Sequence, residues 1–253
     1  MKKIYMLIFM LIFILFTNSL FAEEKDIIIL THEFPNQTVP VNENTIRGLA
    51  GEILTQALKQ SKITYKIIFL PWKRAQIDTV VNNNKKTFIL PLTRNEEREK
   101  NYLWVSKLYD LNTVFITNKN QDPINTFNEA KNKRIGVLLG TSFEDSLNDP
   151  KNSLNKEDIE LSYNHESIIK KLIGGRLDGW YDVKIDITSE LKNENLNLSD
   201  FHFGKKILIE ENYIATSKSI SKELFMKVKN AFESFKKTAD YNKILKKYLE
   251  DIN

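Results

Sequence analysis

The chain alternates short β-branched apolar runs with segments whose apolar residues recur at helical spacing. Its first part predicts strands over residues 26–30, 65–70 and 87–92, and helices over residues 45–60 and 72–81. The last of these strands is expected to end near Pro91. This βαβαβ order predicts a parallel sheet covered by helices, in which ligands bind outside the carboxyl ends of the strands.

A second series of the same kind follows after an interruption. The extended segment 113–117 leads into the polar stretch 118–123, which predicts a crossing to a second lobe. Beyond it we expect strands over residues 134–138, 159–163 and 179–182, and helices from about Ser142 and over residues 166–173. The extended segment 206–217 predicts the return crossing, and two helices are expected after it, at 222–237 and 240–251.

These patterns predict an α/β fold of two lobes joined by two crossing strands that act as a hinge. The first lobe is expected to combine residues 23–112 with residues 209–253, and the second to span residues 113–208. A chain of 253 residues is long enough for two lobes that each bury a core. Hydrophobic residues make up 42% and charged residues 28%, which is typical of a folded soluble protein.

The amino terminus has the three parts of a secretory signal peptide. Lys2 and Lys3 precede an apolar run over residues 4–16, and Ala22 stands before the acidic pair at 23–24. We expect cleavage after Ala22, so that residues 1–22 are removed and the mature protein is periplasmic. An uncleaved membrane anchor is the alternative, although the apolar run is shorter than the ~20 residues of a spanning helix.

Charge and composition exclude several classes of function. Removal of residues 1–22 lowers the formal net charge from +4 to +2. A nearly neutral chain lacks the strongly basic surface on which nucleic-acid binding depends. The absence of cysteine excludes disulfides, thiolate metal sites, a cysteine nucleophile and a lipid-modified amino-terminal cysteine, so we expect a freely soluble monomer. His32, His165 and His202 lack metal-ligand spacing, and no phosphate-binding loop or nucleophile elbow is present. We therefore expect no metal, no cofactor and no catalytic residue.

An ordered series of short motifs runs along the whole mature chain. The motifs are His32-Glu33-Phe34-Pro35, Gly48 with Gly51, Pro71-Trp72-Lys73-Arg74-Ala75, the segment 91–99, Arg134-Ile135-Gly136-Val137 with Gly140-Thr141-Ser142, and Gly175-Arg176-Leu177-Asp178. In this order and spacing they resemble the type II periplasmic solute-binding proteins of the polar amino-acid class. The resemblance implies two lobes that close around a small polar metabolite bearing a carboxylate, and delivery of that metabolite to a membrane permease of an ABC transporter.

The resemblance assigns the ligand carboxylate to Arg98, with Thr93 donating its hydroxyl. A guanidinium makes two parallel hydrogen bonds to a carboxylate, and a nearby helix N-terminus adds free amide donors. The alternative is that Arg98 pairs with a neighbouring glutamate on a solvated helix, because charge runs usually face water. For Arg94, a surface role and a ligand contact both remain open.

The other candidate ligand contacts also have purely structural alternatives. Thr141 and Ser142 are expected to hold a polar group of the ligand from the second lobe, or else to form an ordinary turn and helix cap. Trp72 and Phe34 are expected to supply aromatic walls, or else to belong to the core. Glu33 lies on the same first loop as Phe34 and is a further candidate.

One position departs from the family pattern. Amino-acid binders of this family carry an acidic residue for the ligand ammonium a few positions beyond the Gly-Arg-x-Asp motif, and the matching residue here is Val183. Asp182 is one residue away, and a shift of one residue along a strand turns a side chain to the other face. Asp182 and the nearby Trp180 are nevertheless candidates for facing the ligand. A standard α-amino-acid ligand therefore does not follow from the resemblance.

Two alternative functions use the same scaffold. Some relatives act as dehydratases on cyclic carboxylates, in which case Glu33 or Asp182 would be the general acid, provided that a dry pocket raises its pKa. A sensor partner would instead pass its closure around the ligand to a membrane receptor. Both remain open at this point, while uptake by a solute-binding protein is the function that we predict.

Overall fold

The computed structural model describes residues 25–42 and 45–249. The predicted signal peptide, residues 1–22, and its cleavage site lie outside the described residues. Within the described ranges, every helix is too short or too polar to cross a membrane.

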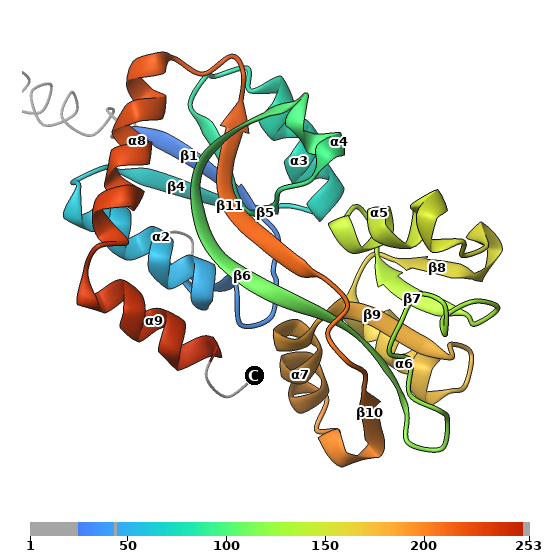
Figure 1. Cartoon of the computed structure of the whole chain (residues 1–253). Helices are drawn as coiled ribbons and strands as arrows, with labels where there is room; N and C mark the ends of the chain where they lie inside the picture. The colour runs from blue at the N-terminus through green and yellow to red at the C-terminus, as the bar shows by residue number, and fades with distance from the viewer. Residues whose placement is uncertain (1–24, 43–44, 250–253) are drawn as a thin grey trace, which may run out of the picture.

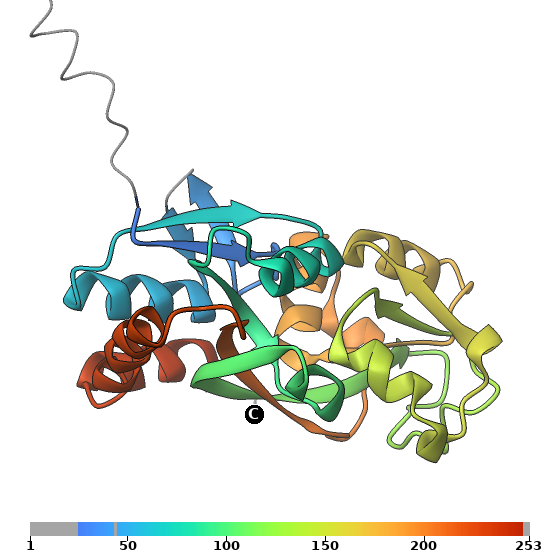
Figure 2. The same cartoon turned by 90° about the horizontal axis from the view of Figure 1, so that it is seen from above.

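Most elements of the fold belong to one of two groups (Figure 1). The first group contains β1 (Ile27–Thr31), β2 (Val39–Asn42), β3 (Thr45–Arg47), α2 (Leu49–Gln60), β4 (Tyr65–Phe69), α3 (Trp72–Val81), β5 (Thr87–Thr93), α4 (Glu96–Glu99), α8 (Lys222–Phe235) and α9 (Ala239–Leu249). The second contains β7 (Ile135–Leu138), α5 (Ser142–Asn148), β8 (Ile159–Ser162), α6 (His165–Ile173), β9 (Gly179–Val183), α7 (Lys184–Asn193) and β10 (Phe201–Phe203). Seen from above, the two groups form two lobes that lie side by side (Figure 2).

Two long strands, β6 (Tyr102–Asn118) and β11 (Ile209–Ser217), connect the lobes. The strand order is β4-β1-β5-β11-β6-β9-β7-β8, with β10 paired to β6. The strands β4, β1 and β5 are parallel, whereas β11 runs antiparallel to both β5 and β6. Strand β6 changes partner along its length, because Asn112 pairs with Ile209 of β11 and the next residue, Thr113, pairs with Val183 of β9. The predicted fold class, two α/β lobes joined by two crossing strands, is confirmed.

The alternating pattern of β1 explains how the first lobe is layered. Ile27 and Ile29 pack in the large core together with the apolar face of α2 and with α8. Leu30 packs on the opposite face of the sheet, in a smaller cluster with Trp72 and Ala75 of α3. Each fully buried aliphatic side chain contributes about 1.5–3 kcal/mol relative to exposure, so the two faces hold helices on both sides of the sheet.

The structure differs from the sequence-based prediction at several places. Residues 45–47 form strand β3 rather than the first turn of a helix, and the helix begins only at Leu49. Pro91 lies inside β5 instead of ending it, at a point where the register with β11 shifts and no ladder hydrogen bond from its nitrogen is needed. Strand β10 and helix α7 were not expected.

Phe115 offers a test of the core beneath the crossing strand. Its ring is fully buried and stacks on Tyr181 of β9 at 4.5 Å between centroids. We expect Phe115→Ala to lower the free energy of unfolding by about 3–5 kcal/mol, because it leaves a cavity under β6. Urea denaturation measures this loss. The control is Tyr163→Ala at a side chain that is 79% exposed, which should change stability by less than about 0.5 kcal/mol.

Candidate functional site

A small buried cavity of about 30 Å³ lies between the two lobes. Six of the nine predicted ligand-binding residues line it: Phe34, Trp72, Thr93, Arg98, Thr141 and Ser142. Its other lining residues are Gln37, Pro91, Phe143, Asp186 and Asn212. The cavity therefore lies where β1, α3 and β5 of the first lobe meet α5 and α7 of the second, at the carboxyl ends of parallel strands.

Arg98 is buried at this boundary, with 6% of its surface exposed. Its Nη1 donates to the backbone carbonyl of Thr93 at 2.8 Å, and its Nη2 donates to the carbonyl of Gly140 in the second lobe at 3.2 Å. Asp145 is the nearest carboxylate, at 4.0 Å from Nη2. Burial lowers the pKa of Arg98, because the charged guanidinium has lost water, although Asp145 offsets part of this effect.

Arg94 takes the surface role that the sequence left open for both arginines. It is exposed, pairs with Glu99, and its guanidinium lies over the rings of Trp104 and Tyr213 at about 5.5 Å and 5.6 Å. The neighbouring glutamate is therefore bound by Arg94, and Arg98 points into the interior instead. The role of Arg98 as ligand anchor remains a prediction.

The hydroxyl groups predicted at the site contact polar partners on both sides of the cavity. Ser142 donates to Glu210 Oε2 of β11 at 3.0 Å, and Thr93 donates to Asn212 Oδ1 at 3.4 Å. Burial raises the pKa of Glu210, a residue that the sequence analysis did not single out. Thr141 caps α5 by accepting from Glu144 and donates to the carbonyl of Leu138, so it serves as the predicted turn and cap while lining the cavity.

Phe34 and Trp72 form one apolar wall of the cavity. Both are buried, and their rings meet edge to face at 5.0 Å between centroids. Pro71 precedes the first residue of α3, which places Trp72 at the strand end as expected. The two rings belong to the core cluster and line the cavity at the same time, so the two alternatives for them do not exclude each other.

Three predicted residues lie elsewhere. Glu33 is exposed and lines a larger cavity at the mouth of the cleft. Asp182 is fully buried on the far face of β9, where it accepts hydrogen bonds from Trp180 Nε1 at 3.2 Å and from the amide of Val183 at 2.7 Å. Trp180 is fully buried in the core of the second lobe. The structure therefore brings neither Asp182 nor Trp180 to the small cavity, because the alternation along β9 turns both side chains toward α6.

Asp186 is the acidic residue that the second lobe presents to the small cavity, and the sequence analysis missed it. It lies in the first turn of α7, is 1% exposed, and accepts two hydrogen bonds from Gln37 Nε2 at 2.9 Å and 2.8 Å. Burial, together with the charge of Asp182, raises the pKa of Asp186 well above its usual value. The pair of Ile187 and Leu191, four residues apart, was the available signal for this helix.

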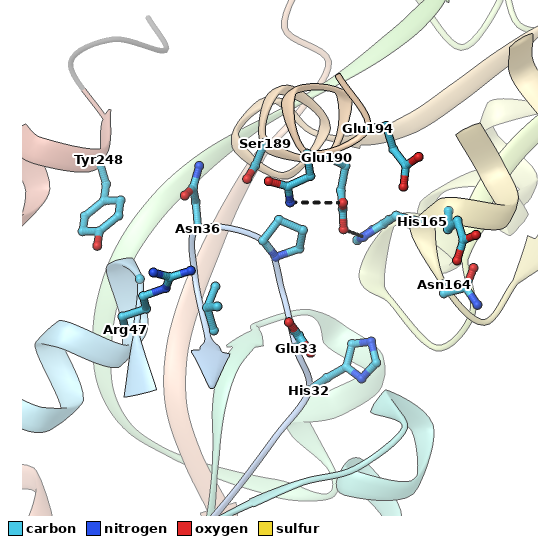
Figure 3. Close-up of a pocket in the computed structure, with 15 residues that line it drawn as sticks. His32, Glu33, Asn36, Arg47, Asn164, His165, Ser189, Glu190, Glu194 and Tyr248 are labelled. Atoms are coloured by element: carbon cyan, nitrogen blue, oxygen red, sulfur yellow. Dashed lines mark hydrogen bonds and ion pairs between the residues drawn. The ribbon is translucent and has the colours of Figure 1, made fainter. Parts of the chain in front are cut away.

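The larger cavity has a volume of about 460 Å³, and Figure 3 shows side chains that line it. His32, Glu33 and Asn36 line it from the loop after β1, while Glu190 and Glu194 line it from α7. The Gln37–Asp186 pair belongs to the same loop and the same helix.

The structure represents a closed conformation, since several hydrogen bonds span the lobes. Besides the Gln37–Asp186 pair, Gln76 donates to the Gly140 carbonyl at 2.8 Å and Asn95 donates to Asp145 at 3.0 Å. A cavity of about 30 Å³ is far below the roughly 300–1,000 Å³ of typical small-molecule sites. A small molecule can therefore enter this cavity only if these lobe-to-lobe contacts open.

The match to a known family follows from the sequence as a whole. Residues 27–251 match the model of the bacterial extracellular solute-binding proteins, family 3. The chain belongs to this family. Among the described residues of this family member, no group of three or more His, Asp or Glu side chains is arranged so that it could hold a metal ion.

Individual relatives agree with this assignment. The histidine-binding periplasmic protein of Escherichia coli (strain K12) is 26% identical over 188 residues, which is 70% of this chain and 66% of the relative. A substrate-binding protein of an ABC uptake transporter from Streptococcus pneumoniae, solved with bound histidine, has a TM-score of 0.76 at 17% identity over 89% of this chain and 93% of its own. A histidine kinase sensor domain has a TM-score of 0.78 at 12% identity over 88% and 95% of the two chains. The two solved structures show that the fold is shared.

Gly48 holds the loop that carries Gln37. Its φ of 94° and ψ of 172° are accessible almost only to glycine, and a Cβ there would lie 2.7 Å from the carbonyl carbon and oxygen of Gln37. We expect Gly48→Ala to lower the free energy of unfolding by about 2–4 kcal/mol. The control is Gly175→Ala, where φ is also positive at 65° but no heavy atom lies within 4 Å. That change should cost only about 1–2 kcal/mol, as measured by thermal unfolding. Equal losses would show that the contact with Gln37 is unimportant.

Proposed function

We propose that this protein is a periplasmic solute-binding protein that closes over a small zwitterionic solute, such as an amino acid, for uptake by an ABC transporter. The observation that carries the proposal is that Arg98 of one lobe and Asp186 of the other line the same buried cavity. Membership of the solute-binding family and its histidine-binding relatives support the same function. This chain matches only 66% of the length of the histidine-binding relatives, so their ligand is not assigned to it.

Arg98 would bind the ligand carboxylate. Its two Nη atoms now donate to backbone carbonyls, which are neutral acceptors, and a carboxylate would replace them with stronger charge-assisted hydrogen bonds. Thr93 and Ser142 stand beside it with hydroxyl groups from the two lobes. Contacts of one ligand to both lobes favour the closed state, because the open state lacks half of them.

Asp186 would bind the ligand ammonium in place of the acid that the family carries at the position of Val183. Gln37 Nε2 donates to both oxygens of this carboxyl group. The ammonium group of a ligand would replace the Gln37 amide as the donor to these oxygens. The partner Tyr109, whose hydroxyl donates to Gln37 Oε1 at 2.8 Å, holds the amide in this orientation. The two proposed contacts match the carboxylate and the ammonium group of an α-amino acid, despite the departure at Val183.

The remaining parts of the proposal concern the setting of the site. We assign residues 23–112 and 209–253 to the first lobe and residues 113–208 to the second, with the change of partner along β6 at Asn112 and Thr113 as support. Residues 1–22 direct export to the periplasm. The monomer releases its ligand to a membrane permease that recognises the closed form.

Ligand identity is tested by a thermal-shift screen of the mature protein. The screen compares the amino acids with dicarboxylates, polyamines and aromatic acids. A true ligand at 100 times its Kd stabilises the folded state by about 2.7 kcal/mol. We expect stabilisation by compounds with both a carboxylate and an ammonium group. Stabilisation by polyamines alone would contradict the carboxylate anchor, and chemical conversion of the stabilising compound would favour an enzyme.

The role of Arg98 is tested with the other arginine of the same segment as control. We expect Arg98→Ala to lower the affinity for the stabilising compound by about 100-fold or more, because two charge-assisted hydrogen bonds of about 1.5–3 kcal/mol each are lost. The exposed Arg94→Ala should leave the affinity unchanged. Isothermal titration calorimetry measures both, and equal affinities for the two variants would refute the anchor.

The role of Asp186 is tested by an exchange of nearly equal volume. Asp186→Asn keeps the contact with the loop but removes the negative charge, so affinity for an ammonium ligand should fall by about 10-fold to 100-fold. The control Glu157→Gln makes the same acid-to-amide change on the exposed surface of the second lobe. Unchanged binding by Asp186→Asn, measured by calorimetry, would show that another group holds the ammonium.

A further inference from the structure

Three acidic residues at four-residue spacing run from the end of β9 into α7, and the middle one lines the small cavity. Asp182 is the last residue but one of β9, and Asp186 and Glu190 follow on α7. His165, the first residue of α6, faces this row from the neighbouring helix. Figure 3 shows His165 joined to Glu190 at the inner edge of the larger cavity.

Both nitrogens of the His165 ring face a carboxylate. Nε2 lies 3.0 Å from Asp182 Oδ2, and Nδ1 lies 3.4 Å from Glu190 Oε1. The ring is 5% exposed, and the indole of Trp180 covers it at 5.4 Å between centroids. A neutral imidazole donates from one nitrogen only, so satisfying both carboxylates requires the doubly protonated imidazolium.

The environment favours this charged form. Burial by itself disfavours the imidazolium, but the hydrogen bonds to Asp182 and Glu190 outweigh it and raise the pKa of His165 to about 10. His32, by contrast, donates from Nδ1 to the carbonyl of Leu70, and burial lowers its pKa. At neutral pH the row therefore contains one fixed positive charge, on His165.

The charges around Asp186 then determine what the cavity accepts. The titratable groups that face Asp186 are Asp182 on β9, Glu190 on α7, His165 on α6 and Tyr109 on β6. Asp182 opposes ionisation of Asp186 and His165 favours it. The imidazolium compensates one of the other two carboxylates, so the group carries one excess negative charge while Asp186 is protonated and two when Asp186 is ionised.

We propose that His165 is a positioning residue that sets the charge of the ligand site, so that Asp186 ionises when the ligand supplies one cationic group beside it. The inference rests on the proposed ammonium contact of Asp186. Binding of an ammonium ligand then releases a proton from Asp186, and affinity rises with pH until Asp186 is already ionised in the free protein. Without the imidazolium, Asp182 and Glu190 suppress ionisation of Asp186, and the site no longer accepts the cation well.

The charge of His165 is measured without any ligand. Nitrogen-15 chemical shifts of labelled histidine in the wild-type protein distinguish a doubly protonated ring from a neutral one. We expect His165 to be doubly protonated at pH 8, while His32 is neutral. The signals are assigned with His32→Gln and His202→Gln, so the assignment does not depend on folding of a His165 variant. A neutral His165 ring at pH 8 would overturn the inference and leave the proposed solute binding intact.

The coupling to the ligand is measured by calorimetry with the amino acid that gives the largest thermal shift. Titrations in buffers of different ionisation enthalpy should show proton release by the wild type. His165→Gln should lower the affinity at pH 7 by about 10-fold or more, since a shift of one pKa unit corresponds to a factor of ten. It should also move the pH profile of binding to higher pH. An unchanged profile in a folded variant would restrict His165 to a structural role.

A charge-compensated double variant provides the rescue. Asp182→Asn combined with His165→Gln removes one negative and one positive charge, so the pH profile should return toward that of the wild type. A purely structural role would instead make the double variant bind more weakly than the single one. If the wild type binds no amino acid at all, the proposed function fails, and the histidine shifts still decide the charge of His165.

Stability gives a third readout, with a defined sign. The pKa of His165 rises from 6.5 to about 10 on folding, so its stabilising contribution is complete below pH 6.5 and is lost as pH rises toward 10. The melting temperature of the wild type should fall across this window. The decline should be smaller in His165→Gln, and an equal decline in both proteins would contradict the buried imidazolium.

Discussion

The structure depends on a buried guanidinium and a buried carboxyl group that stand on opposite sides of one cleft. Arg98 comes from the first lobe and donates to two backbone carbonyls, while Asp186 comes from the second and accepts from the Gln37 amide. Burial of a charge beside neutral partners costs several kcal/mol relative to water. The proposed zwitterionic ligand would supply a counter-charge to each group at once, so these two buried groups would favour such a ligand over a neutral one.

The frame that brings these charges together is set by backbone geometry. Strand β6 runs through both lobes, with partners from β11 along its first part and from β9 along its last. Gly48 lets the loop with Gln37 pass within van der Waals contact of the helix α2 start, where any Cβ would collide. Pro91 lies at a register shift of β5 and faces the cavity. Local backbone departures thus occur where the lobes meet.

Behind the cavity, the second lobe balances charge among neighbouring side chains. The imidazole of His165 faces Asp182 and Glu190, and Asp182 in turn faces the site of Asp186 through the protein interior. In a medium of low polarity such charges influence one another over several ångströms. In the proposed function, the ligand site therefore extends beyond the side chains that touch the cavity, and its charge depends partly on residues of α6 and α7.

The amino-acid sequence by itself determined the two-lobed α/β fold, because strand and helix periodicity and turn residues are local properties of the chain. The helix over 72–81 has the bounds that its pattern predicts, and the motif order led to Arg98, which the structure buries between the lobes. Only the tertiary structure decided which acid faces the cavity. The sequence does not distinguish the roles of Asp182 and Asp186. In the structure, Asp182 on β9 points toward His165 of α6, whereas Asp186 in the first turn of α7 points into the small cavity. Pairings such as Gln37 with Asp186, 149 residues apart, depend on how the lobes meet, which no local pattern encodes.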